Sequence, residues 1–177
     1  VPRRPTSASS AGSATAVSAP SSGARTTRPP SNSTMISLAP SGARTVSTPP
    51  ALIASGSRLH GLQTWVALPV EEEECEPRFE HYAADRIPQA DADGAFVRII
   101  LGEAFGQVSP VQTASATLYV EVNLPAGVSL QVPDHCDETG LYVVSGEVRI
   151  GETVLDEGSL AVLRHGAAPI VTGIGDA

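Results

Sequence analysis

The sequence predicts an all-β fold, a sandwich or barrel of short antiparallel strands, preceded by an N-terminal segment without stable structure. The 177-residue chain changes composition at about residue 58, because all 19 Asp and Glu residues and every Trp, Tyr and Phe lie beyond it. Beyond that point, short stretches alternate apolar and polar residues between turn signals, and none shows a long helical period. Strands of this length and spacing are typical of a sandwich or barrel.

Residues 1–57 consist almost wholly of Ala, Ser, Thr, Pro, Gly and Arg. They hold too little apolar area to offset about 1–2 kcal/mol of backbone entropy per ordered residue, so we expect them to be disordered. Three interpretations of this segment stay open. The first is a genuine disordered segment. The second is an organellar transit peptide, because such peptides are also rich in Arg and Ser. The third is a frame error in a GC-rich coding sequence, and the absence of Lys from the chain suggests such a coding sequence.

The net charge of −8 is unevenly divided between the two parts. Residues 1–57 carry five Arg and no acid (+5), whereas residues 58–177 carry six Arg and 19 acids (−13). An acidic folded part repels phosphate, and the five Arg are too scattered to form a basic patch, so we expect no direct binding of nucleic acid. The chain also lacks an apolar run of about 18 residues and a signal-peptide core, which predicts a soluble, cytoplasmic protein without a membrane span.

The predicted folded region, residues 58–177, begins with a strand and a loop. Leu59–Pro69 alternates in a way that suits a strand buried on both faces, and Pro69 ends it. The acidic run Glu71–Glu74 is expected to be a solvated loop, because four adjacent carboxylates do not converge on a metal ion. Arg78–Pro88 then predicts a short strand followed by a turn, and Ala90–Gly94 is rich in turn residues.

The remaining strands follow at short intervals. They are expected over Ala95–Leu101, Thr117–Leu124, Gly140–Val144, Glu147–Ile150, Thr153–Leu155 and Leu160–Leu163. The third and fourth of these are predicted to form a hairpin about Ser145–Gly146. Alternation within the strands assigns one face of each to the core. The predicted core residues are Leu118, Val120, Val122, Leu141, Val143, Val148, Ile150 and Val162.

Seven blocks of the sequence, in order and spacing, match one known pattern. The blocks are Leu59–Pro69, Glu76–Phe79, Ile87–Pro88, Asp93–Gly94, Val97–Glu103, Ser109–Val111 and Tyr142–Val148. They resemble the pirins, a family of the cupin superfamily, over roughly residues 58–175. The resemblance implies the end of an N-terminal cupin barrel followed by most of a C-terminal one, and therefore a jelly-roll fold.

The pirin resemblance also implies a chemistry. It implies one non-haem iron in the N-terminal barrel, held by a His-x-His pair and a His-x-Glu pair, and an activity of the quercetin 2,3-dioxygenase type on a flavonol. Both pairs lie upstream of the block matched by Leu59–Pro69, and residues 1–59 contain no His, Asp or Glu. We therefore predict no metal ligand, cofactor or catalytic residue in the chain as written, which is an incomplete and inactive pirin. The alternative is a protein-interaction module that acts through a protein partner, as pirins that are transcriptional cofactors do.

The second barrel implied by the resemblance could hold a metal only if it kept the general cupin ligands. That pattern has a His-x-His, a Glu and a later His, each at a fixed spacing from a Gly. We place the two Gly positions of the pattern on Gly146 and Gly158. Its ligand positions then fall on Pro133, His135, Thr139 and Ala161. Only one of the four residues is a ligand, which is too few for a stable iron or zinc site.

Other residues that could carry chemistry are better explained as structural or solvated. His135 with Glu138 makes at most a weak ligand pair, and the remaining side chains considered are His60, His81, His165, Glu103 and Glu147. Cys75 and Cys136 lie far apart without a CxxC motif, which favours idle or buried thiols. The predicted strand Leu59–Pro69 would pair inside a barrel that this chain does not encode, so we expect an exposed apolar edge at Leu62–Leu68 and self-association through it.

Overall fold

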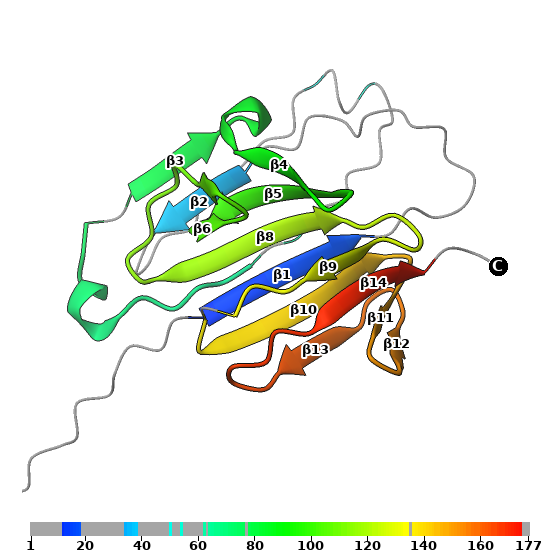
Figure 1. Ribbon diagram of the computed structural model, residues 1–177. Coiled ribbons are helices and arrows are strands. Elements are labelled where there is room, and N and C mark those ends of the chain that lie inside the picture. Colours follow the sequence, from blue (N-terminus) through cyan, green and yellow to red (C-terminus); the bar gives the residue numbers. More distant parts are fainter. Residues whose placement is uncertain are drawn as a thin grey trace, which may run out of the picture. The chain divides into compact units, whose positions relative to one another are not determined.

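The computed structural model describes residues 12–18, 34–38, 50, 54, 62, 64–76, 78–134 and 136–174 (Figure 1). These fall into two compact units, one made of Val1–Met35 with His81–Ala177 and the other of Ile36–Glu80. The first unit thus takes in residues from both sides of residue 58, and a division at residue 57 stays a prediction. Within the described residues, no helix is long and apolar enough to cross a membrane.

A six-stranded sheet forms one layer of the first unit, in the order β13-β10-β1-β8-β5-β4 (Figure 1). Its strands are β1 (Gly12–Ser18), β4 (Gln89–Ala92), β5 (Ala95–Leu101), β8 (Thr117–Asn123), β10 (Glu138–Ser145) and β13 (Leu160–Leu163). The hairpin between β4 and β5 turns at Asp93 and Gly94, whose φ angles are 55° and 88°. Two successive positive φ angles match the twist of paired strands, and the Asp91 carboxylate accepts a hydrogen bond of 3.0 Å from the Gly94 amide.

A four-stranded sheet forms the second layer, in the order β12-β11-β14-β9. Its strands are β9 (Ser129–Gln131), β11 (Glu147–Ile150), β12 (Thr153–Leu155) and β14 (Ile170–Ile174). The hydrophobic core takes side chains from both sheets, so the two layers face each other as in a jelly roll. A short hairpin of β6 (Glu103–Ala104) and β7 (Gln107–Val108) lies beside them. The all-β, cupin-type jelly-roll fold is therefore confirmed.

The remaining described elements are short. Strand β2 (Thr34–Leu38) pairs with β3 (Arg78–Tyr82), and the 3-10 turns η1 (Val70–Glu72) and η2 (Ala84–Arg86) flank β3 in the chain. Turn η1 covers the start of the acidic run, whose four side chains are exposed, as the loop prediction requires.

The predicted core is confirmed at most of its positions. Leu118, Val120, Val122, Leu141, Val143 and Val148 are buried, and the partly buried Ile150 packs against them. Val162 is wrong, since its side chain is 78% exposed. It lies on β13, the edge strand of its sheet, where Ala161 and Leu163 point to the core and the alternate positions point to solvent.

The predicted hairpin about Ser145–Gly146 is also wrong. Strand β10 pairs with β1 and β13, whereas β11 pairs with β12 and β14, so the two strands belong to different sheets. Of the two turn residues, only Gly146 has a positive φ, of 74°. A type I′ hairpin needs two such residues, so here the chain turns a corner from one sheet to the other.

The strand predicted over Leu59–Pro69 is not observed in its described part. Leu62 and residues 64–69 have no regular secondary structure, and the Trp65 side chain is 87% exposed rather than buried. The alternation of this block suits a strand, but a strand buried on both faces needs neighbours on both faces.

Strands β1 and β2 lie within the segment for which the composition predicts no stable structure of its own. The other residues of that segment, apart from 50 and 54, are outside the described part of the chain. Strand β1 pairs with β8 and β10, so its order rests on two strands of the barrel and needs no core from its own segment.

Candidate site at the barrel interior

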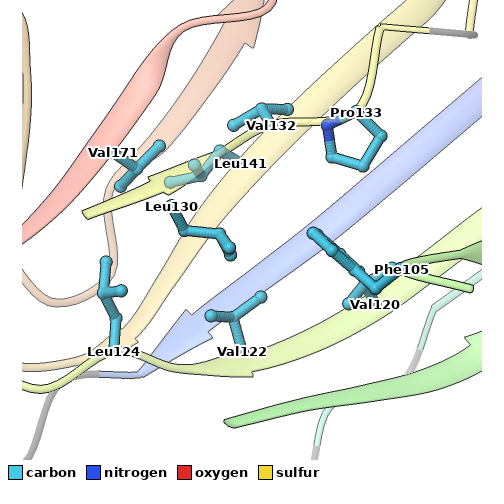
Figure 2. A pocket seen from close by; sticks show the side chains of 9 residues that line it. All are labelled: Phe105, Val120, Val122, Leu124, Leu130, Val132, Pro133, Leu141 and Val171. Carbon is cyan, nitrogen blue, oxygen red and sulfur yellow. The ribbon is translucent and has the colours of Figure 1, made fainter. Parts of the chain in front are cut away.

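The space between the two sheets contains a small cavity of about 10 Å³, which is the size of a single water molecule (Figure 2). Its walls come from both sheets, from the connections after β8 and β9, and from the turn between β6 and β7. The lining residues are Phe105, Val120, Val122, Leu124, Leu130, Val132, Pro133, Leu141 and Val171. All nine are apolar, so the interior of this barrel is a packed hydrocarbon core.

The positions that the cupin pattern assigns to metal ligands do reach this interior. Pro133 lines the cavity, Thr139 on β10 is 7% exposed, and Ala161 on β13 packs against the core. Strands β10 and β13 are adjacent, with Leu141 opposite Ala161 in the register. His135 lies outside the described residues. The sequence pattern thus located the interior positions, and the residues found there carry no metal-binding group except the neutral hydroxyl of Thr139.

These residues do not fit the iron that the cupin fold implies. Iron and zinc sites in proteins take several imidazole, carboxylate or thiolate donors that converge on one point. A proline, an alanine and a threonine offer a single weak oxygen, surrounded by valine and leucine side chains. Among the described residues, no three His, Cys, Asp or Glu side chains gather closely enough to hold a metal ion.

Phe105 is a lining residue that the sequence did not single out. It is the first residue of the turn between β6 and β7, with a φ of 51°, and Gly106 follows with a φ of 71°. A bulky residue in this left-handed conformation costs roughly 1–2 kcal/mol. The partly buried ring packs against the core and forms part of the cavity wall, which offsets that cost (Figure 2). A Phe-Gly pair gives no usual turn signal, so propensity alone did not predict the turn.

The side chains weighed for catalysis or metal binding are dispersed over the structure. His81, Glu103, Glu138 and Glu147 are exposed, and His60 lies outside the described residues. His165 is an exposed side chain whose Nδ1 lies 3.0 Å from the Asp137 carbonyl oxygen. None of the described ones contributes to the barrel interior.

The two cysteines are not paired. Cys136 is buried in the hydrophobic core and Cys75 is half-buried, and both are free thiols. Among the residues that the structure describes, neither cysteine belongs to a group of three or more His, Cys, Asp or Glu side chains that could hold a metal ion.

Comparisons with known proteins agree with the fold. No protein-family model matches the chain. It is 38% identical over 112 residues to a pirin-like protein of Caulobacter vibrioides, which is 63% of this chain and 39% of the relative. It is 36% identical over 118 residues to the pirin of Homo sapiens, which is 66% of this chain and 39% of the relative.

Among solved structures, a crystal structure of quercetin 2,3-dioxygenase from Acinetobacter baumannii superposes with a TM-score of 0.56 at 24% identity. The superposition covers 64% of this chain and 38% of that one. The chain thus spans about two fifths of the length of the curated relatives it matches. The resemblance to pirins is confirmed over about two thirds of the chain.

Proposed function

Because the chain carries a pirin-like cupin barrel, we propose that this barrel is a non-catalytic module that binds no iron and acts through contacts with other proteins. The observation that supports this most directly is the chemistry of the ligand positions. Pro133, Thr139 and Ala161 stand where the cupin pattern requires donors, and the cavity beside them is lined only by apolar side chains. A lone imidazole at His135 would leave a metal ion with too few ligands to resist water and chelators.

Metal analysis tests this proposal. The chain is incubated with Fe²⁺ and desalted, and its iron content and its turnover of quercetin under O₂ are measured. We expect far less than one iron per chain and no turnover above that of free Fe²⁺. The matched variants are His135→Ala, at the one remaining ligand position, and His165→Ala, at an exposed site. Stoichiometric iron that is lost in the first variant and kept in the second would refute the proposal.

Contact with proteins is supported by apolar side chains that reach the surface. Leu62, Trp65 and Val66 are all about half exposed or more, although this segment forms no strand in its described part. We propose that this apolar segment, residues 62–68, is a self-association surface, because clustered apolar side chains in water favour burial against another copy or partner. The acid-rich folded part disfavours direct contact with nucleic acid, and we propose a cytoplasmic setting for the chain.

A second candidate function is iron-dependent oxidation of a flavonol by a longer protein of which this sequence is a part. The observation that favours it is the structural likeness to a quercetin 2,3-dioxygenase, together with relatives that are much longer than the matched region. The metal ligands would then come from residues outside the match. The coding DNA upstream of residue 58 distinguishes the two functions. Another frame that encodes a His-x-His and a His-x-Glu pair would favour the dioxygenase, and the absence of such a frame would favour the non-catalytic module.

A further inference from the structure

Strand β1 occupies an unusual place in the six-stranded sheet. It lies between β8 and β10 and runs parallel to both, with Ala14 opposite Tyr119 on one side and opposite Gly140 on the other (Figure 1). All other pairings between described strands of the two large sheets are antiparallel. Residues 19–116 separate β1 from β8 along the chain. The middle of this sheet is thus completed by a segment from a distant part of the sequence.

The slot that β1 fills cannot close by itself. Neighbouring strands lie about 4.8 Å apart, so β8 and β10 are separated by about twice that distance and cannot pair directly. Their inner faces belong to the core, since Val120, Val122, Leu141 and Val143 are almost completely buried. If β1 left, two rows of backbone amides and carbonyls in the middle of the sheet would lose their partners.

The segment that fills the slot has little capacity to fold without it. Gly12–Ser18 reads Gly-Ser-Ala-Thr-Ala-Val-Ser, with no charge and one branched aliphatic residue. The composition of residues 1–57 predicts disorder in isolation, because the segment cannot bury enough apolar area. The strand conformation is therefore supplied by the edges of β8 and β10, as when a peptide adds a strand to a sheet.

We propose that the slot between β8 and β10 is a docking site for an extended, uncharged peptide segment running parallel to both strands, which Gly12–Ser18 of the same chain fills as a detachable donor strand. The backbone ladders on both sides recognise an extended segment of any small residues. A charged segment would be disfavoured, since β1 lies in the middle of the sheet between two strands whose inner faces belong to the core.

Disulfide trapping tests the assignment and its register in the full chain. In a Cys75→Ser, Cys136→Ala background, Ala14→Cys is combined with Tyr119→Cys, its partner in the register. Facing residues on adjacent strands lie within the Cα separation that a disulfide tolerates, about 4.4–6.8 Å. The control combines Ala14→Cys with Asn123→Cys, which pairs instead with Ser18. We expect an intrachain disulfide in the first variant and none in the control. A disulfide formed only between chains, or equally in both variants, would overturn the proposal.

Competition by a free peptide tests whether the strand is detachable. Thr15 lies opposite Val120 and Leu141, and Thr15→Pro removes an amide from the ladder and weakens docking. We expect amide exchange at residues 118–122 and 139–143 to rise on the order of tenfold or more, and a synthetic peptide of residues 10–20 to reverse the rise.

A peptide of residues 10–20 with Thr15→Pro, which lacks one amide of the ladder, and the full-chain variant Thr27→Pro, outside β1, serve as controls. The proposal fails if Thr15→Pro leaves exchange in β8 and β10 unchanged. It also fails if the peptide with Thr15→Pro restores protection as well as the native peptide does. Amide hydrogen exchange on the unmodified chain adds a third measure. The amides of Gly12–Ser18 should exchange faster than those of residues 118–122, because β1 can leave the sheet without global unfolding.

Discussion

Arg98 and Glu121 form an ion pair across strands β5 and β8, with 2.5 Å between the Arg98 Nη1 and Glu121 Oε2 atoms. The two residues are direct partners in the strand register. The Arg98 side chain is only 12% exposed and its guanidinium lies 5.9 Å from the centre of the Phe96 ring, whereas the Glu121 side chain is 38% exposed. The pair therefore lies in a partly desolvated layer on the outer face of the sheet, where a charge without its partner is costly.

Removal of the acid should therefore cost more than removal of the base. Glu121→Gln leaves the Arg98 charge without its counter-ion, and we expect the free energy of unfolding to fall by about 1–3 kcal/mol. Arg98→Met keeps an unbranched apolar stem against Phe96, so its cost should be smaller. Urea unfolding measures both. The control is Arg78→Met in the pair with Glu80, whose atoms are 3.9 Å apart and whose side chains are well exposed, with an expected change within about 0.5 kcal/mol. The double variant Arg98→Met, Glu121→Gln should be no less stable than Arg98→Met alone. If Glu121→Gln and Arg78→Met lowered the free energy of unfolding equally, the result would contradict this account.

Strand alternation predicts that the same substitution prevents folding on the inner face of the large sheet and is tolerated on its outer face. Val120→Asp or Val143→Asp places an unpaired carboxylate in the core and also removes apolar packing. Because a domain is stable by only about 5–15 kcal/mol in free energy of unfolding, these variants should not fold. Val162→Asp is the matched control, because its side chain is 78% exposed on the edge strand β13. Circular dichroism and solubility on expression are the measurements. Cooperative folding of Val120→Asp would show that the register is wrong.

Gly173 on strand β14 is required by close backbone contact and not by its φ angle. A Cβ atom at this position would lie 2.4 Å from the Pro125 carbonyl oxygen and 2.7 Å from that of Leu124. The carbonyls belong to the backbone and cannot rotate away as a side chain can, so Gly173→Ala should lower the free energy of unfolding by roughly 2 kcal/mol or more. Gly140→Ala is the control, because among the side chains that the structure describes its added Cβ would meet the Leu160 Cδ1 atom at 3.6 Å, an ordinary contact. Thermal unfolding of both variants decides the matter, and equal melting temperatures would contradict the argument.

Gly173 also shows why the sequence predicted some strands and missed others. Ala95–Leu101, Glu147–Ile150, Thr153–Leu155 and Leu160–Leu163 were predicted with the bounds that the structure has, because each is a short stretch rich in apolar residues between turn signals. Strand β14 was missed because a glycine inside a strand usually signals a break, and only the tertiary contact with residues 124 and 125 explains it.

Long-range pairing set the other limits of prediction. The alternation in Gly140–Val144 and Glu147–Ile150 gave two correct strands, but nothing local states that they join different sheets. Strand β1 has no apolar alternation of its own, and its order comes from β8 and β10, which lie far along the chain. The cupin spacing placed Pro133, Thr139 and Ala161 at the interior, because spacing reflects strand register, whereas the role of Phe105 depends on a turn that no motif marks.

The exposed segment at residues 62–68 leads to the last prediction, on self-association. Trp65 is 87% exposed and Leu62 and Val66 are each about half exposed, so this segment offers apolar area that association would remove from water. Trp65→Ser should therefore raise the concentration at which the chain dimerises or aggregates, by roughly tenfold if the indole contributes about 1.4 kcal/mol to the contact. Analytical ultracentrifugation over a range of concentrations measures this, with Trp65 fluorescence as a second readout, because burial of the ring shifts its emission to the blue. The control is Val154→Ser, which removes an exposed apolar side chain elsewhere on the surface, from the edge strand β12. If the unmodified chain stayed monomeric at high concentration, or if Val154→Ser had the same effect as Trp65→Ser, residues 62–68 would not be the surface of association.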